Sequence, residues 1–298
     1  MIKTSIKNDF LDLFYHDMVN IGLENSNTLN AFTLKIRNNS FTYDELVESL
    51  SNQIYHFALS RTEVIALTNS GDFGTLVNKA KEKLRRYSAN EGELGEILLY
   101  CLLETHLNAP KILTKLELKT AKNDYVKGAD GVHLLKVTDA DYQLILGESK
   151  LNSDLKKGIY EAFGSLEKLL NENKKLEFEI GLVNSQLVKE AFDDTLYQFL
   201  KKIIVPSARE DKTNMDYSFG IFLGFNVDIT DDELKLPNSE YRTVVRDKIK
   251  KIIEENVQAI NYQIKKAGFR GYDFYLYLYL IPFSDLSSIR KQVIQDLT

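Results

Sequence analysis

The apolar side chains change period several times along the chain, and each change predicts a different kind of element. From residue 94 to residue 104 they recur at helical spacing, which predicts a helix with one buried stripe. The segments that follow alternate between apolar and polar positions or form short apolar runs, which is typical of strands. These predicted strands are 112–118, 132–137 and 142–150. Polar turns separate them, so we expect an antiparallel meander.

A second helix is predicted after the meander, with Ser153 or Asp154 as its N-cap. The run 176–183 is then predicted to be a fourth strand, which the crossover helix places beside the meander. The order helix, three strands, helix, strand predicts an α/β (α+β) core with a central mixed sheet flanked by helices.

Further elements are predicted on both sides of this core: strands at 31–36, 219–225 and 272–281, and helices after Thr42, at 186–203 and around 245–260. Proline is scarce, with 4 residues, and no linker composition appears. We therefore predict a single compact domain over 1–298. Its core is expected at about 88–185, with an N-terminal elaboration at 1–87 and a C-terminal elaboration at 186–298.

Composition narrows the class of protein. The chain is 44% hydrophobic and 27% charged, which is ordinary for a globular protein. Its single cysteine, Cys101, excludes an intramolecular disulfide and fits a reducing compartment. No apolar run approaches the roughly 20 residues of a membrane span, so we expect a cytoplasmic protein without a membrane partner. The net charge of −5 counts mildly against a protein that finds DNA unaided.

Three residues form the candidate catalytic site. Asp130 stands between two glycines before the predicted strand 132–137, and Glu148 and Lys150 end the next strand. Side chains two positions apart on a strand share a face, so Glu148 and Lys150 project together. Two carboxylates can bind Mg²⁺ or Mn²⁺, and an adjacent lysine can orient a water. The alternatives are a surface ion pair for Glu148 and Lys150 and a turn residue for Asp130.

Two acids on the predicted helix 94–104 are further candidates for metal ligands. Glu93 follows Asn90 by three residues and could instead complete a capping box. Glu96 has no capping role and borders the apolar face, where an unpaired carboxylate would be costly. Which of the two joins the site stays open.

His133 is close to Asp130 in sequence, but alternation along the strand argues against a role. Val132 and Leu134 are expected on the side of the site, so His133 should face away from it.

Basic residues supply candidates for DNA contacts. Arg85 and Arg86 end the most basic window of the chain, and Lys156 and Lys157 begin the helix after Lys150. Either pair could face phosphates or simply be solvated.

The pattern of Asp130 followed by Glu148-Ser-Lys150 resembles the PD-(D/E)xK nuclease superfamily, whose core also runs helix, three strands, helix, strand. This resemblance implies a restriction-endonuclease-like core. The chain departs from the pattern at one position, because Ala129 precedes Asp130 where the superfamily has proline.

Longer strings are similar to the nuclease subunit of the Hachiman bacterial anti-phage system. They are Gly92-Glu-Leu-Gly-Glu-Ile-Leu-Leu-Tyr100, Gly128-Ala-Asp-Gly-Val-His133 and Gly147-Glu-Ser-Lys-Leu151. The resemblance implies a DNase that acts on DNA broadly, with a superfamily-2 helicase subunit as the partner that restrains it. A catalytically inactive nuclease-like module that binds DNA or a protein partner is the alternative.

Overall fold

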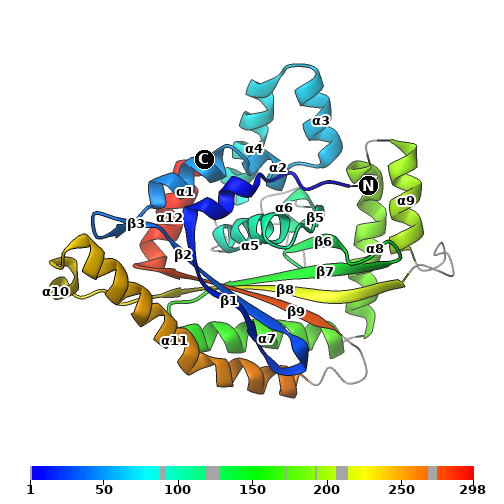
Figure 1. The fold of residues 1–298 in the computed structure, drawn as a ribbon. Coiled ribbons are helices and arrows are strands. Elements are labelled where there is room, and N and C mark those ends of the chain that lie inside the picture. Colours follow the sequence, from blue (N-terminus) through cyan, green and yellow to red (C-terminus); the bar gives the residue numbers. More distant parts are fainter. Residues whose placement is uncertain are drawn as a thin grey trace.

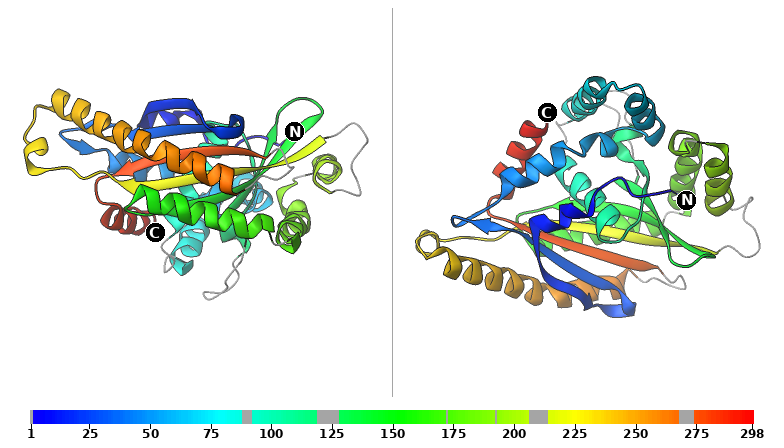
Figure 2. Two further views of the ribbon diagram at one scale, coloured as in Figure 1. Left: turned by 90° about the horizontal axis from the view of Figure 1, so that it is seen from below. Right: turned by 45° about the horizontal axis from the view of Figure 1, so that its top comes forward.

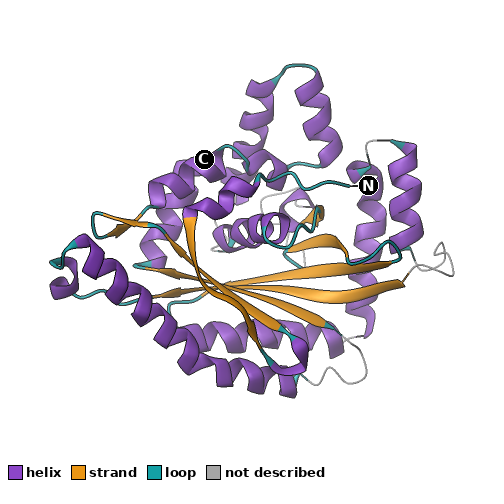
Figure 3. Ribbon diagram, viewed as in Figure 1, coloured by secondary structure: helices purple, strands orange, loops and turns teal. Residues whose placement is uncertain are grey.

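The computed structural model describes residues 2–87, 92–118, 128–171, 173–191, 193–205, 214–267 and 274–298. A twisted mixed sheet crosses the middle of the molecule, and helices cover both of its faces (Figures 1 and 3). The predicted fold class, a central mixed sheet flanked by helices, is confirmed.

The central sheet has seven strands within the described residues, in the order β1-β2-β9-β8-β7-β6-β5. Strands β2, β9, β8 and β7 are parallel neighbours, and the pairs β1–β2, β7–β6 and β6–β5 are antiparallel. The antiparallel meander β5–β6–β7 is therefore confirmed. The strand bounds are β1 Phe14–Gly22, β2 Thr28–Leu34, β5 Lys111–Thr114, β6 Gly131–Lys136, β7 Asp141–Leu151, β8 Asn214–Asn226 and β9 Tyr275–Phe283. A separate two-stranded ribbon consists of β3 Ile36–Arg37 and β4 Ser40–Phe41.

Helix α5 (Glu93–Thr105) packs against β7 and β8 on one face, and α7 (Leu155–Asn171) packs against the same strands from the other. The long α11 (Asn238–Lys266) lies beside α7 (Figure 2). The other helices are α1 Tyr43–Ser51, α2 Ile54–Ala58, α3 Arg61–Asn69, α4 Phe73–Tyr87, α6 Lys115–Leu118, α8 Asn173–Glu190, α9 Asp194–Ile204, α10 Asp231–Leu234 and α12 Leu286–Leu297, with short 3-10 turns η1 Asn8–Leu13 and η2 Glu24–Ser26. No helix in these ranges combines the length and apolar character needed to cross a bilayer.

The predicted fourth strand at 176–183 is wrong, because this segment belongs to α8. Its buried side chains recur three or four residues apart, at Glu179, Val183, Leu187 and Glu190, which is helical spacing. The strand that follows the crossover is β8, which lies parallel to β7. The predicted helix 186–203 is correct only in part, because two helices share this range. α8 ends at Glu190, and α9 begins at Asp194 with the Asp193 carboxylate as its cap, 2.7 Å from the Leu196 nitrogen.

The predicted strand 112–118 is correct only to Thr114. The chain then turns into the short helix α6, and the Thr114 hydroxyl accepts a hydrogen bond from the Glu117 nitrogen at 3.3 Å. For the helix at 94–104, the expected N-cap Asn90 lies outside the described residues, and the helix begins at Glu93.

The sheet draws strands from all three predicted parts of the chain. β1 and β2 come from 1–87, and β8 and β9 come from 186–298. Close packing holds α5 against this sheet: a Cβ on Gly220 would lie 3.1 Å from the Leu103 side chain. The division of the chain at 88 and 185 stays a prediction.

Glu104, near the end of α5, connects distant parts of the chain although its side chain is completely buried. Its carboxylate accepts hydrogen bonds from the backbone nitrogens of Ser5, of Ile6 at 3.1 Å and of Lys111 at 2.7 Å. Burial raises its pKa, while these hydrogen bonds act in the opposite direction. The N-terminal segment is therefore held to α5 and β5 by one side chain.

We predict that Glu104→Ala lowers the free energy of unfolding by about 3 kcal/mol, because three buried N–H donors lose their acceptor. Urea denaturation measures the loss, and amide exchange at Ser5 and Ile6 should accelerate. The exposed Glu48 on α1 is the matched control, and Glu48→Ala should change stability by less than about 0.5 kcal/mol. Equal effects of the two substitutions would contradict the role of Glu104.

Candidate active site

The Asp130 carboxylate is fixed from two neighbouring elements. It lies just before β6, and its backbone nitrogen donates to the Gly147 carbonyl of β7 at 2.9 Å. Oxygen Oδ2 accepts hydrogen bonds from the Ser149 nitrogen at 2.8 Å and from the Ser149 hydroxyl at 2.9 Å. Only 8% of Asp130 is exposed. Its orientation is therefore set by β7, the strand that carries the Glu-x-Lys sequence.

Glu148 and Lys150 project together from β7, as alternation predicted. The Lys150 Nζ lies 2.5 Å from a Glu148 carboxylate oxygen. Burial and the charge of Asp130 raise the pKa of Glu148, although Lys150 and the Ser165 hydroxyl of α7 oppose this. Burial lowers the pKa of Lys150, but the acids Glu148 and Asp130 outweigh it and leave that pKa raised. The structure thus brings Asp130, Glu148 and Lys150 into one electrostatic cluster.

Lys115 is a second lysine in this cluster, and the sequence analysis did not identify it. Its Nζ lies 3.3 Å from Asp130 Oδ1. Burial lowers its pKa, but the charges of Asp130, Glu96 and Glu148 raise it to a larger extent. The misassigned strand 112–118 concealed this residue, because α6 is what turns it toward Asp130.

Glu179 of α8 is a further acid that the sequence analysis missed. Its carboxylate accepts a hydrogen bond from the Ala129 backbone, immediately before Asp130. A Cβ on Gly128 would lie only 2.4 Å from Glu179 Oε1. Burial raises the pKa of Glu179 to about 7, with a further upward contribution from Asp130. Glu179 therefore supports the turn that carries Asp130.

Glu96 and Glu93 occupy the first turn of α5 and are both buried. Glu96 lines a small cavity that Asp130 also lines, which places it on the Asp130 side of the helix. Glu93 lies three residues earlier, in the same turn. Across the described ranges, no three His, Cys, Asp or Glu side chains are grouped so that they alone could hold a metal ion. A metal role for Glu96 or Glu93 stays a prediction.

The expected orientation of His133, away from Glu148 and Lys150, is confirmed. In the pairing of β6 with β7, Val132 lies opposite Leu146 and His133 opposite Ile145, so His133 is on the other face of the sheet from the Glu148 and Lys150 side chains. His133 lines the same cavity as Asp130 and Glu96, together with Tyr100. Its Nδ1 is 2.8 Å from the Ala109 carbonyl, and burial lowers its pKa to about 4. The imidazole is therefore neutral at pH 7 and packs as part of the interior behind Asp130.

The candidate DNA contacts lie in different places. Lys156 and Lys157 are exposed in the first turn of α7, where the Asp154 carboxylate accepts from the Lys157 nitrogen at 2.8 Å. Arg85 donates to the Thr298 carbonyl at the end of α12. The Arg86 side chain lies outside the described residues. Contact with DNA stays a prediction for all four.

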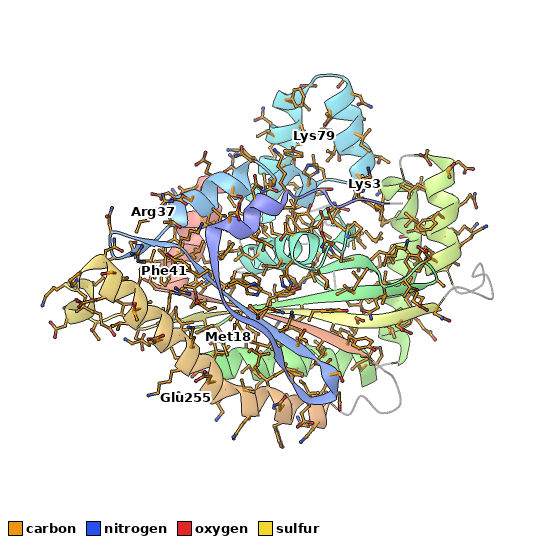
Figure 4. All side chains as sticks on the ribbon, viewed as in Figure 1. Lys3, Met18, Arg37, Phe41, Lys79 and Glu255 are labelled. Atoms are coloured by element: carbon orange, nitrogen blue, oxygen red, sulfur yellow. The ribbon has the colours of Figure 1, made fainter. Side chains whose placement is uncertain are left out.

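Two further lysines of the basic window on α4, Lys79 and Lys83, make contacts within the protein. Lys79, on the hairpin that α3 and α4 form at the top of the molecule, pairs with Glu63 at 2.8 Å (Figure 4). Lys83 is partly buried and donates to the Glu117 carbonyl at 3.2 Å. These two lysines are therefore engaged within the fold.

The donor set fits a hard divalent cation. Asp130 and Glu148 supply carboxylate oxygens close enough for their charges to interact. Because the N–H and C=O of a residue point to the same edge of a strand, the Ser149 carbonyl faces the same side as the nitrogen that binds Asp130. Mg²⁺ commonly takes one or two carboxylates and completes its shell with water and substrate phosphate. Two carboxylates and a carbonyl meet that requirement.

The fold and the candidate site together define the class of protein. It is a mixed α/β protein in which Asp130, just before β6, lies beside the Glu-x-Lys sequence of β7. The family is HamA, whose model matches residues 8–297, and the chain belongs to that family. HamA is a component of the Hachiman anti-phage defence system, which includes a helicase partner. The resemblance to Hachiman is thereby confirmed. A search of curated proteins finds no match to the chain.

We predict that Glu179→Gln makes stability less dependent on pH. The pKa of Glu179 is about 7 in the folded protein, against an ordinary 4.5, so the folded state retains a proton that the unfolded state releases. Its contribution to stability is fully present below pH 4.5 and is lost as the pH rises through 7. Between pH 5 and pH 8 the variant should gain up to about 3 kcal/mol relative to the wild type.

Urea denaturation across this pH range measures the effect, and the exposed Glu177, two residues earlier on α8, is the matched control. Glu177→Gln should follow the wild-type pH profile. Parallel profiles for wild type and Glu179→Gln would show that Glu179 is not held in a perturbed environment.

We predict that Gly128→Ala destabilises the protein by about 2 kcal/mol or more. Its φ of +142° disfavours any side chain, and the new Cβ would collide with the Glu179 carboxylate. Gly164→Ala in α7 is the control, because a Cβ there meets nothing within 4 Å. That substitution should be neutral or stabilise the helix by about 0.5–1 kcal/mol. If Gly128→Ala and Gly164→Ala changed the unfolding temperature equally, the explanation given for the turn before Asp130 would be contradicted.

Proposed function

We propose that this chain is the metal-dependent DNase of its Hachiman system and that its helicase partner regulates it. The observation that carries the proposal is the convergence of Asp130 with Glu148 and Lys150, whose ammonium lies 2.5 Å from Glu148. A carboxylate pair with an adjacent lysine is suited to phosphodiester hydrolysis. A separate helicase that engages DNA also fits a chain with net charge −5.

Each residue has a distinct role in this proposal. Asp130 and Glu148 would hold Mg²⁺ or Mn²⁺, with the Ser149 carbonyl as a further oxygen ligand. The chemistry that such a cation supplies is polarisation of the scissile phosphate and neutralisation of its charge. Lys150, positioned by Glu148, orients the attacking water or stabilises the charge that develops on the phosphate. The Ser149 nitrogen and hydroxyl keep Asp130 in place.

The helicase partner would restrain the nuclease until aberrant DNA engages the complex, as the family resemblance implies. Lys156 and Lys157, exposed at the start of α7, follow Lys150 closely in the chain and are the proposed contacts with the DNA backbone. Arg85 is a weaker candidate because it already donates to the Thr298 carbonyl.

We predict that Asp130→Asn, Glu148→Gln and Lys150→Gln each reduce DNA cleavage by about 10²-fold or more, because each removes a charge from the reacting centre. The assay uses the full chain with its helicase partner, plasmid and linear DNA, and Mg²⁺, with EDTA as the metal-free arm. Matched controls are Asp139→Asn and Lys136→Gln, which remove an ion pair between the last residue of β6 and the turn that follows it.

Cleavage that survives in the three site variants would place the activity elsewhere. Absence of cleavage by the wild-type complex on intact and damaged DNA would instead favour the inactive nuclease-like module.

A further inference from the structure

Lys115 is placed against Asp130 by backbone as well as side-chain contacts. It is the first residue of α6, directly after β5 ends at Thr114. Its backbone nitrogen donates to the Asp130 carbonyl at 3.1 Å, and its Nζ lies 3.3 Å from Asp130 Oδ1. Both side chains are largely enclosed, with 23% of Lys115 and 10% of Asp130 exposed. The contact is therefore an organised one and differs from a chance pairing of two solvated side chains.

The opposite side of α6 is anchored in the interior. Glu117 forms an ion pair with Lys111, and both side chains are nearly inaccessible to solvent. The Lys111 Nζ also donates to the carbonyls of His56 and Leu59, each at 2.8 Å. This anchor fixes the short helix and thereby directs Lys115 toward Asp130.

The two oxygens of Asp130 have different partners. Oδ2 accepts both hydrogen bonds from Ser149, whereas Oδ1 faces the Lys115 ammonium. A divalent cation that binds Asp130 through Oδ1 must therefore compete with an ammonium that already occupies that position.

We propose that Lys115 is a built-in counter-cation, which neutralises Asp130 in the metal-free protein and is displaced from Oδ1 when a divalent metal ion binds. This inference rests on the proposed function only in requiring a metal site at Asp130. It assigns Lys115 a positioning role separate from that of Lys150, whose ammonium pairs with Glu148.

Electrostatics predicts that the charge of Lys115 weakens the binding of a metal ion at Asp130. An ammonium and a divalent cation at the same carboxylate repel each other, and interactions between charges a few ångströms apart are large in a partly enclosed site. The flexible lysine chain can swing away and relieve most of this repulsion. Removing the charge should therefore tighten metal binding by about tenfold, a fraction of the full Coulomb term.

Isothermal titration of Mn²⁺ and Mg²⁺ into the full chain tests this inference without any cleavage assay. Lys115→Met keeps most of the length of the side chain and removes its charge, and we expect it to bind Mn²⁺ about tenfold more tightly than the wild type. Lys115→Arg keeps a cation and should bind as weakly as the wild type. Lys136→Gln, at the exposed end of β6, should leave the affinity unchanged, and Asp130→Asn should abolish binding.

Thermal unfolding gives a second readout, independent of heats of binding. Without metal, Lys115→Met should melt below the wild type because Asp130 loses its counter-ion. At the same excess of Mn²⁺ the variant should show the larger rise in Tm, since a ligand at free concentration L stabilises the folded state by RT ln(1 + L/Kd), which is larger for the tighter binder.

The possible results separate the two proposals. Metal binding that is tighter in Lys115→Met than in the wild type, with wild-type affinity in Lys115→Arg, supports the role of Lys115 as counter-cation. The same conclusion holds if the wild type binds the metal too weakly to detect. Equal or weaker binding by Lys115→Met, with wild-type binding lost in Asp130→Asn, overturns the counter-cation and leaves the metal site intact. Absence of binding in every variant overturns the counter-cation and the proposed metal-dependent function together.

Discussion

The position of the Asp130 carboxylate depends on contacts from three other elements of the fold. β7 holds Oδ2 through Ser149, α6 presents Lys115 to Oδ1, and α8 supports the preceding turn through Glu179 and the Ala129 backbone. These elements are separated in sequence, so the site exists only when the central sheet and its covering helices are assembled. A carboxylate held from several sides keeps its geometry without help from a ligand.

Charge balance explains how Asp130 and Glu148 can be largely buried at this point. Isolated buried carboxylates are costly, but each acid here lies near a lysine: Asp130 near Lys115, and Glu148 near Lys150. Glu179, with a pKa of about 7, carries only part of a negative charge at neutral pH. Lys115 and Lys150 thus each offset one neighbouring carboxylate, that of Asp130 and that of Glu148 respectively.

The helices that support Asp130 are themselves anchored by buried ions. Glu190 at the end of α8 is fully buried, accepts from the Arg61 nitrogen at 3.1 Å and lies 3.7 Å from the Arg61 guanidinium. Burial raises its pKa to about 8. On α6, Glu117 has the same function through its ion pair with Lys111. Both helices therefore carry one ionisable residue toward Asp130 and another into the interior, and the geometry of the candidate site depends on α3 and β5.

Periodicity alone located the meander, α5, α7 and the candidate triad, because those segments follow their own period over many residues. Periodicity failed in two segments, 176–183 and 115–118. In each, two charged residues stand two positions apart: Glu177 and Glu179 in the first, and Lys115 and Glu117 in the second. A strand at 176–183 would direct Glu177 and Glu179 to one face, but in α8 they diverge by more than half a turn, so Glu179 is buried and Glu177 is exposed. The same difference in α6 sends Lys115 to Asp130 and Glu117 to Lys111.

A four-residue helix has no periodic pattern of its own, and the contacts that select it come from residues distant in the chain. The two residues that complete the surroundings of Asp130, Lys115 and Glu179, were therefore the ones that local patterns could not reveal.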